Sequence, residues 1–331
     1  MTTRSVGVVI AARNAGATIG AAVGSALRCA QVYELVVVSD GSADGTAAAA
    51  AGAASGDDRL RVLSLASNVG PAEARNRGMA MLTTDLVAVL DADDQFLPGR
   101  FEALLTREDW DLVADNVAFV PALGTAPSWT APGRHDRPRF EPLSLVQFAL
   151  GNLVQPGRSR GEMGFLKPVV SRAFLDRHRL RYDPRLRLGE DYDLYVRILA
   201  AQGRFLLTRQ PGYLALVRRD SLSSRHGTAD LEALCGAMRD HLAHPGLDAA
   251  QRSALARVLR QMERRHAHRA ILDRKAQGGA TAALLALAAR PAWVPAVAWG
   301  VVRDKLGWGR HDALNGEDFR LLLAEEPTGS G

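Results

Sequence analysis

The sequence predicts an α/β fold in which helices flank a mixed, mostly parallel sheet, followed by a helical C-terminal region. Two observations carry this prediction. Over about the first 120 residues, short β-branched runs alternate with alanine-rich stretches, which is the pattern of β-α-β units. After His226, the chain is expected to be wholly helical.

The expected strands are short and apolar, and they cover residues 6–12, 35–39, 60–65, 86–90 and about 111–120. The helices expected between them cover about residues 18–29, 46–54 and 71–83. From residue 121 to 142, Pro, Gly, Ser and Arg dominate, which predicts a loop that is mobile or covers the substrate. Helical and strand signals resume over residues 143–217.

The composition is that of a soluble globular protein, with 331 residues, 47% hydrophobic and 23% charged. Lys and Arg exceed Asp and Glu by 41 − 36 = 5, which suits anionic partners such as nucleotides. Nucleic acid is not expected as a partner, because no recognition motif is present. Cys29 and Cys235 stand far apart, so they indicate reduced core thiols rather than a disulfide or metal motif.

The most informative motif is acidic and follows an expected buried strand, because residues 86–90 run directly into Asp91, Ala92, Asp93 and Asp94. In open α/β sheets, ligands bind outside the carboxyl ends of the strands. Alternation along an extended chain points Asp91 and Asp93 the same way, and two such carboxylates suit Mg²⁺ or Mn²⁺. By themselves, these residues could equally form a solvated turn that caps the next helix.

Two further turns belong to the first half of the chain. Asp40 and Gly41 end the second expected strand, where a carboxylate can accept hydrogen bonds from a base or ribose and a glycine permits close approach. Asp44, just beyond, is expected only to start a helix. Arg75 lies early in the helix that precedes the acidic strand, so it can reach the strand ends. A solvated surface helix is the alternative there.

Two more charged clusters lie in the second half. Glu190, Asp191 and Asp193 open a helix whose dipole stabilises acidic residues, so capping is an alternative to catalysis. Three carboxylates in four residues exceed what capping needs. Arg225 and His226 belong to a basic loop that could fold over a phosphate-bearing ligand.

Taken in order, these motifs resemble the family 2 inverting glycosyltransferases with the GT-A fold. The resemblance covers about residues 5–228. It rests on the opening strand with its Asn-containing turn, and then on Asp40-Gly41-Ser42, Ala74-Arg75-Asn76, Asp91-Ala92-Asp93-Asp94 (a DXD motif) and Gly189-Glu190-Asp191. Around the last two motifs, the sequence is similar to bacterial exopolysaccharide enzymes of the succinoglycan glucosyltransferase type.

The resemblance implies a nucleotide-diphosphate sugar as donor, with a UDP-sugar expected, and it implies roles for single residues. Asp40 would touch the nucleobase and Arg75 would support the nucleotide. Asp91 would contact ribose or metal-bound water, Asp93 would bind Mg²⁺ or Mn²⁺, and Asp191 would be the general base.

Further candidate positions complete the expected site. The other donor-binding candidates are Ala11, Arg13, Gly41, Asn68 and Ala92, and His226 is the second candidate metal ligand. The candidates near the acceptor, or behind the ligand-binding residues, are Asp94, Asp115, Glu190, Asp193 and Arg225.

The residues also suit the chemistry independently. Displacing a nucleoside diphosphate from an anomeric carbon leaves charge on the phosphates, which a cation at Asp93 can stabilise. On the opposite face of the sugar, a carboxylate must take the proton from the incoming hydroxyl. Asp191 suits this task, because one displacement without an enzymic nucleophile gives inversion. Glu190 and Asp193 compete for the same role.

One departure and two alternative functions accompany this prediction. Ser39 stands where the family often has a first Asp before Asp40, which weakens the inference about which nucleobase the donor carries. A sugar nucleotidyltransferase would need a Gly-rich loop with Arg and Lys at residues 11–16, which read Ala-Ala-Arg-Asn-Ala-Gly. A non-catalytic nucleotide-sugar-binding module of a polysaccharide assembly complex is disfavoured by intact Asp91, Asp93 and Asp191. The Gln-x-x-Arg-Trp signature and spans of processive synthases are missing, so we expect one sugar to be added to a lipid-linked saccharide.

The expected organisation is a glycosyltransferase domain at residues 1–227 and a helical region at residues 228–331. Within the domain, residues 1–120 form the nucleotide-binding half and residues 121–227 the acceptor half. In the C-terminal region, Arg290 and Pro291 split two apolar stretches, so no spanning helix of about 20 apolar residues is expected.

Tryptophans near basic residues in the C-terminal region indicate an interfacial anchor instead, and these are Trp293, Trp299 and Trp308 with Arg303, Lys305 and Arg310. A helix packed on the main domain is the alternative. The first apolar run, at residues 6–12, is too short for a signal sequence. We therefore expect a cytoplasmic enzyme that lies peripherally on the cytoplasmic face of the inner membrane.

Overall fold

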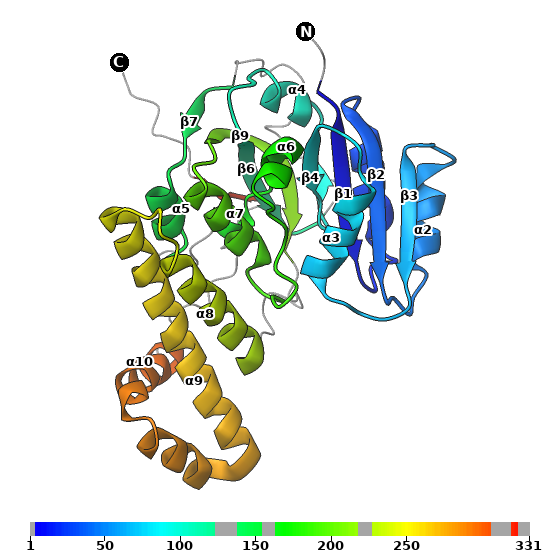
Figure 1. Ribbon diagram of the computed structural model, residues 1–331. Coiled ribbons are helices and arrows are strands. Elements are labelled where there is room, and N and C mark those ends of the chain that lie inside the picture. The colour runs from blue at the N-terminus through cyan, green and yellow to red at the C-terminus, as the bar shows by residue number, and fades with distance from the viewer. Residues whose placement is uncertain (1–3, 123–137, 154–162, 218–226, 306–318, 324–331) are drawn as a thin grey trace.

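A single mixed sheet organises the catalytic part of the protein, which we describe from a computed structural model (Figure 1). The structure describes residues 4–122, 138–153, 163–217, 227–305 and 319–323. The strand order is β3-β2-β1-β4-β8-β6-β9-β5, with β10 paired to β6 and β7 paired to β9. The strands are β1 (Val6–Ala12), β2 (Val32–Asp40), β3 (Leu60–Leu65), β4 (Leu86–Val89), β5 (Gln95–Phe96), β6 (Leu112–Val120), β7 (Phe140–Pro142), β8 (Val169–Ser171), β9 (Phe205–Leu216) and β10 (Arg320–Leu321).

The sheet is mixed, and its long ladders are parallel. β1 pairs in parallel with β2 and β4, β2 with β3, and β6 with β9. The antiparallel ladders of β8 with β4 and β6, and of β5, β7 and β10 with their neighbours, are short. The predicted fold class is therefore confirmed.

Helices cover both faces of the sheet because the central strands are apolar on both sides. Along β1, Val9 packs toward the cluster that includes α3 and α7, whereas Val8 and Ile10 pack toward the cluster that includes α1 and α2. The helices of the catalytic part are α1 (Ile19–Leu27), α2 (Thr46–Ala54), α3 (Pro71–Met81), α4 (Arg100–Leu104), α5 (Leu145–Gly151), α6 (Arg172–Arg177) and α7 (Glu190–Ala200).

The elements predicted over the first 120 residues are confirmed, with small shifts at their ends. β1, β3 and α2 have the predicted bounds, while α1 and α3 end two residues early. At Leu82, the backbone leaves the helical region and becomes extended, so α3 cannot continue. Within the expected loop at residues 121–142, the structure describes only the ends, where Phe140–Pro142 forms β7.

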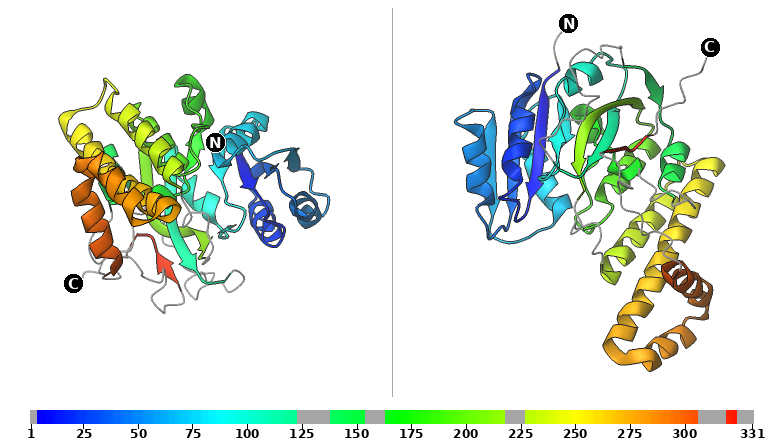
Figure 2. Two further views of the ribbon diagram at one scale, coloured as in Figure 1. Left: turned by 90° about the horizontal axis from the view of Figure 1, so that it is seen from below. Right: turned by 180° about the vertical axis from the view of Figure 1, so that it is seen from behind.

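The C-terminal region contains α8 (Thr228–Leu242), α9 (Ala249–Ala288), a 3₁₀ turn at Pro291–Trp293 and α10 (Val294–Lys305). α8 packs against α7 and α9, and α10 packs against α9. Non-helical backbone at Gly278 and Gly279 breaks α9, so its second part turns away before the chain folds back (Figures 1 and 2).

The prediction that the chain is wholly helical after His226 is wrong in one respect. Arg320–Leu321 forms β10, which pairs antiparallel with Phe119 and Ala118 of β6. Beyond this ladder, Leu322 N donates to Val117 O, and the side chain of Asn116 bonds the backbone of Leu323. Two residues are too short for a strand to be recognised by alternation, so only the tertiary contact defines it.

No single described helix is both long and apolar enough to cross a membrane. One pair, Ala249–Ala288 with Pro291–Val302, meets both conditions together, and it is bent by 106°.

Candidate active site

Asp91 lies just beyond β4, where two buried cations hold its carboxylate. Its Oδ1 accepts a hydrogen bond from Arg75 Nη2 at 2.8 Å, and its Oδ2 lies 2.8 Å from Lys167 Nζ. Burial by itself would raise the pKa of Asp91, but the charges of Lys167 and Arg75 hold that pKa below its usual range. Asp91 is therefore a fixed anion at the end of the strand.

Asp191 opens α7 and shares both of these cations. Its Oδ1 accepts from Arg75 Nη1 at 3.1 Å and from the Tyr182 hydroxyl at 3.0 Å, and its Oδ2 accepts from Lys167 Nζ at 2.7 Å. Only 7% of Asp191 is exposed. The structure thus brings together the two acidic motifs that the sequence places 100 residues apart.

α7 begins where it does because Gly189 adopts a left-handed conformation, with φ of 72°. A Cβ at that position would lie 2.9 Å from Leu234 Cδ1 of α8, so no larger residue fits without displacement. This turn sets the first residues of α7 against the sheet ends. The backbone around a single glycine therefore fixes where Asp191 lies.

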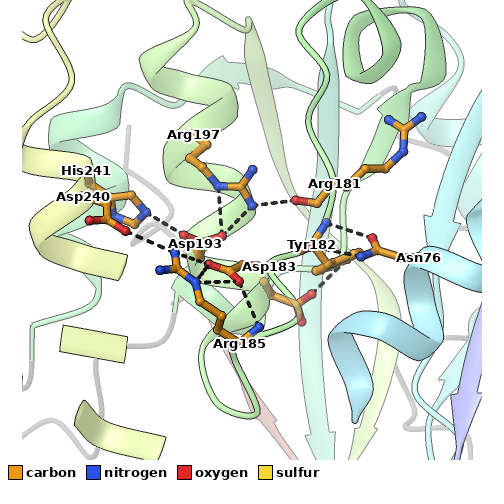
Figure 3. A network of polar contacts seen from close by, with 10 residues as sticks. Asn76, Arg181, Tyr182, Asp183, Arg185, Asp193, Arg197, Asp240 and His241 are labelled. Carbon is orange, nitrogen blue, oxygen red and sulfur yellow. Dashed lines mark hydrogen bonds and ion pairs between the residues drawn. The ribbon is translucent and has the colours of Figure 1, made fainter. Parts of the chain in front are cut away.

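Arg75 is the centre of the network and is 5% exposed. Besides Asp91 and Asp191, its guanidinium contacts Glu190 Oε1 at 2.6 Å and lies 5.3 Å over the Tyr182 ring. Asn76, the next residue, exchanges two hydrogen bonds with the backbone of Tyr182 (Figure 3). Arg75 thus joins the acidic strand end to α7, and its predicted contact with the nucleotide stays a prediction.

Glu190 contacts Arg75 rather than standing alone as a second base. Burial raises the pKa of Glu190, although the charge of Arg75 opposes this effect. In the described residues, Glu190 and Asp191 therefore form one cluster around a shared cation, Arg75.

Lys167 is the residue that sequence reasoning missed. Its ammonium joins Asp91 to Asp191, and it is 5% exposed. Burial would lower the pKa of Lys167, but the charges of Asp191 and Asp91 raise it above its usual range, so the side chain stays protonated. The available signal was a single lysine between Leu166 and Pro168, in a stretch otherwise apolar from Phe165 to Val170.

Asp115 supports Lys167 from behind. Asp115 is 3% exposed, and its two oxygens pair with Arg100 Nε at 2.8 Å and with Arg100 Nη2 at 3.0 Å. The same Nη2 donates to the carbonyl oxygen of Lys167. The prediction of Asp115 as an acceptor-binding residue is wrong, because both oxygens are buried in this ion pair. Its other predicted place, behind the ligand-binding residues, stays a prediction.

Asp94 holds the acidic strand end against β9. Its Oδ2 accepts from the Tyr213 hydroxyl at 2.8 Å, its Oδ1 accepts from Leu216 N at 2.9 Å, and Asp91 N donates to the Tyr213 oxygen at 3.1 Å. Burial, together with the charges of Asp91 and Asp93, raises the pKa of Asp94 well above its usual range. Asp94 therefore supports the strand end through its contacts with β9. Of its two predicted places, near the acceptor or behind the ligand-binding residues, these contacts favour the second.

Asp40 organises the loop that precedes α3. Its Oδ1 accepts from Val69 N at 2.7 Å, and its Oδ2 accepts from Asn68 Nδ2 at 2.8 Å and Gly70 N at 3.0 Å. Gly41 has φ of 61°, and a Cβ there would lie 2.6 Å from Asn68 N, so this turn requires glycine. The predicted contact of Gly41 with the donor stays a prediction. The contact of Asp40 with a nucleobase stays a prediction.

The turn after β1 lies beside the turn after β2, as a donor-binding edge requires. Asn14 N donates to Ser42 Oγ at 3.2 Å, and Ala43 N donates to Asn14 Oδ1 at 2.9 Å. Asp44 accepts from Gly16 N and from Thr46 N at the start of α2, which confirms its expected place at a helix start. The candidates Ala11 and Arg13 flank this junction, Ala92 lies between Asp91 and Asp93, and their donor contacts stay predictions.

Asp193 points away from Asp191 and does not join the site. The two residues are two positions apart on α7, a rotation of about 200°, so their side chains lie on opposite faces. Asp193 contacts His241 Nε2 of α8 at 2.7 Å and Arg197 Nε at 3.0 Å (Figure 3). The prediction of Asp193 as a competing base or acceptor residue is therefore wrong.

Two candidates, Arg225 and His226, lie outside the residues that the structure describes. Their predicted contacts with the diphosphate and the metal stay predictions. Ser39, which replaces the family's first Asp, donates through its hydroxyl to Ser42 Oγ at 3.0 Å. The serine thereby stabilises the turn that carries Gly41.

The residues beyond β4 fit a hard divalent cation. Within the described part of the chain, no three His, Cys, Asp or Glu side chains gather as a metal site. Mg²⁺, however, usually takes one or two carboxylates and completes its shell with water and substrate phosphates. The pKa of Asp94 is raised first by burial and then by the negative charges of Asp91 and Asp93. A cation held by the half-buried Asp93 would offset part of that negative charge.

Comparison with known proteins decides the family. The model of "Glycosyl transferase family 2" matches residues 7–169. Succinoglycan biosynthesis protein ExoU of Rhizobium meliloti (strain 1021) is 45% identical over 325 residues, which cover 96% of this chain and 94% of that protein. The chain belongs to glycosyl transferase family 2. A second protein of that organism, succinoglycan biosynthesis protein ExoO, is 32% identical to this family 2 enzyme over 76% of the chain and 72% of its own length.

Solved structures give the same fold for this family 2 glycosyltransferase. S. aureus TarS 1-349 in complex with UDP-GlcNAc matches with a TM-score of 0.61 and 17% identity, over 88% of this chain and 79% of that one. TarS 1-349 alone matches with a TM-score of 0.62 and 16% identity, over 96% and 95%. These structures confirm the predicted GT-A fold, and membership of the family confirms the predicted glycosyltransferase activity. Neither alternative function, nucleotidyltransferase or non-catalytic module, finds support in these comparisons.

Proposed function

We propose that this enzyme transfers one sugar, with inversion, from a UDP-sugar to a lipid-linked saccharide during exopolysaccharide assembly. The observation that carries the proposal is the pair of cations shared by Asp91 and Asp191. They join the strand end, where a donor would bind, to a carboxylate that can face the acceptor. The name of ExoU supports a polysaccharide of the succinoglycan type, and the UDP-GlcNAc complex of TarS supports the donor class.

In this mechanism, Asp191 Oδ2 is the atom that takes the proton. Among the described residues, Oδ1 accepts two hydrogen bonds, from Arg75 and Tyr182, whereas Oδ2 accepts one, from Lys167. A carboxylate oxygen has two lone pairs, so Oδ2 keeps one for the acceptor hydroxyl. As that hydroxyl oxygen bonds to the anomeric carbon, its proton moves to Oδ2 and the bond from carbon to the diphosphate oxygen breaks.

The donor end of the site holds the leaving group. Asp93 follows β4, and the turn of Asp40 and Gly41 ends β2, so both lie at the carboxyl ends of strands that pair with β1. They belong to the half that would hold the diphosphate and nucleoside. Mg²⁺ or Mn²⁺, bound through Asp93, would supply positive charge to the departing diphosphate. Arg75 holds the carboxylates of Asp91 and Asp191 next to each other, because its guanidinium donates to both. We also propose a cytoplasmic location, which the buried, unpaired thiols of Cys29 and Cys235 support.

The base assignment is tested by Asp191→Asn, with Asp193→Asn as the matched control on the other face of α7. We expect Asp191→Asn to lower kcat by about 10²- to 10⁴-fold while donor binding is kept, because asparagine cannot accept the proton. Asp193→Asn should retain transfer. Normal transfer by folded Asp191→Asn protein would overturn the assignment. Product analysis of the anomeric configuration tests inversion in the same assay.

The donor is identified by a panel of nucleotide-sugars, each with and without Mg²⁺. A ligand that binds the native state raises the unfolding temperature according to its occupancy. We expect UDP-sugars to raise it, and to raise it more with the metal present. If only nucleotides with another base stabilised the protein, the UDP assignment would fail while the mechanism at Asp191 would still stand.

A further inference from the structure

Exposed apolar side chains gather in one part of the molecule. We use the name C-terminal hairpin for residues 272–302. They contain the end of the first part of α9, its second part after Gly279, the 3₁₀ turn at Pro291–Trp293 and residues 294–302 of α10. Among the described residues, the large hydrophobic side chains that are exposed are Tyr33, Leu272, Leu284, Leu285, Val294, Trp299, Val301 and Val302. All of them except Tyr33 lie on the C-terminal hairpin.

The hairpin packs around a small core that includes Ile271, the residue before it, and we call the exposed residues outside that core its outer face. Ile271, Ala283 and Val297 are buried together, with Leu287 and Trp293 packed against them. On the outer face, Leu284 is 66% exposed and Leu285 is 68% exposed. The hairpin therefore has two apolar sides, of which the fold covers one, and it projects away from the sheet (Figures 1 and 2).

The charges of the hairpin are mostly positive. Its one carboxylate, Asp273, pairs with Arg269 at 3.0 Å, and its other charged residues are Arg274, Lys275 and Arg290. The guanidinium of Arg290 lies 4.6 Å over the Trp293 ring, at the turn between the helices. An apolar face beside an excess of cations is complementary to the surface of a bilayer, where negatively charged headgroups cover the hydrocarbon.

We propose that the C-terminal hairpin docks on the surface of an anionic lipid bilayer, with Leu284, Leu285 and Trp299 entering the boundary between headgroups and acyl chains. A second copy of the chain is a poorer partner, because a symmetric contact brings the same patch against itself. The excess of cations beside each face would then meet an equal excess on the other copy. The bilayer is the partner that satisfies both the apolar area and the charge. This inference does not depend on the identity of the donor or acceptor.

The test is flotation of the full-length protein with two kinds of vesicle, one of phosphatidylcholine with phosphatidylglycerol and one of phosphatidylcholine alone. We expect the wild type to float with the anionic vesicles and to be released as salt rises, because salt screens the cations. Leu284→Glu/Leu285→Glu should weaken this binding by at least about tenfold, because two exposed apolar side chains no longer enter the bilayer.

Tyr33→Glu is the matched control, because Tyr33 is 53% exposed but lies on β2, outside the hairpin. It should float as the wild type does. Circular dichroism and donor-induced thermal stabilisation establish that each variant is folded. The proposal is overturned if the wild type stays in the soluble fraction, or if the double variant floats as well as the wild type. It is also overturned if the wild type is a dimer that the double variant dissociates, with no vesicle binding by either.

Discussion

Lys167 Nζ lies 2.7 Å from Asp191 Oδ2 in a buried ion pair, and the same ammonium contacts Asp91 at 2.8 Å. Lys167 and Arg75 together contact three carboxylates, those of Asp91, Glu190 and Asp191. Buried charges are expensive unless they are paired, so each member of this cluster depends on the others. The position of the proposed base is therefore set by a cation on the short segment between a 3₁₀ turn at Met163–Phe165 and β8.

Lys167→Met should lower both activity and stability. Removing one partner of a buried pair leaves uncompensated charge, so we expect the free energy of unfolding to fall by about 3 kcal/mol. We expect kcat to fall about 100-fold, because the carboxylate of the base loses its orientation. Steady-state transfer and urea unfolding measure the two effects. Lys275→Met, which removes an exposed lysine, should change neither, and normal transfer by Lys167→Met would contradict the role of Lys167.

Removal of the divalent cation should stop transfer. We expect EDTA to lower the rate at least about 100-fold, and Mg²⁺ or Mn²⁺ to restore it, because the departing diphosphate loses its balancing charge. Asp93→Ala should need a higher metal concentration for half-maximal rate. Asp109→Ala removes an exposed carboxylate that pairs with Arg107 on the surface, so it should need the same metal concentration for half-maximal rate as the wild type. A rate that EDTA leaves unchanged would remove the metal from the proposal.

The contact of Asp193 with α8 should make stability depend on pH in acid. Burial would raise the pKa of Asp193, but His241 and Arg197 hold it below its usual range. A carboxylate with a lowered folded pKa stabilises the fold above its unfolded pKa of about 3.9, and this stabilisation is lost as the pH falls through the folded pKa. Asp193→Asn should therefore cost about 2 kcal/mol at neutral pH.

The difference between wild type and Asp193→Asn should close below about pH 4, as measured by urea unfolding across a pH series. Asp176→Asn is the control, because Asp176 pairs with Arg181 on the surface, where such pairs contribute little. A difference that stays constant down to low pH would show that the charge of Asp193 does not stabilise the contact.

Two glycines should respond to alanine in opposite directions. A Cβ at Gly212 would lie 1.8 Å from Asp115 Oδ2, so Gly212→Ala should displace the pair that supports Lys167 and lower the free energy of unfolding by about 2 kcal/mol. Gly236 lies within α8, where a Cβ would meet nothing within 4 Å. Gly236→Ala should raise the free energy of unfolding by about 1 kcal/mol, because alanine favours the helix. Equal effects at both positions would contradict this packing.

The nucleotide-binding half could be predicted closely because its physics is local. Its strands are apolar runs that end in polar turns, so β1 and β3 were found with their bounds, and Asp91 was placed at a strand end. It was harder to predict from the sequence which side chains of a helix face the sheet. Asp191 and Asp193 look alike in sequence, and only the packing of α7 against α8 shows which one meets the sheet.

The residues that sequence reasoning missed act through distant partners. Lys167 carries no motif, and its importance comes from two carboxylates that lie 76 and 24 residues away along the chain. Tyr182 and Tyr213 contribute hydroxyls whose targets are likewise set by tertiary contacts. β10 is too short to show a pattern. Such features depend on which elements meet, and no local signal carries that information.

The return of the chain to β6 changes how the helical region should be handled in the laboratory. The helices of residues 228–305 leave the sheet after β9 and the chain comes back to it at β10, so they are an insertion between two strands rather than a tail. Asn116 Nδ2 donates to Leu323 O at 2.9 Å, and a protein cut after β9 would lose this bond together with the strand. A shortened protein should therefore keep β10 and also α8 and the first part of α9, because these helices share the core of the catalytic part.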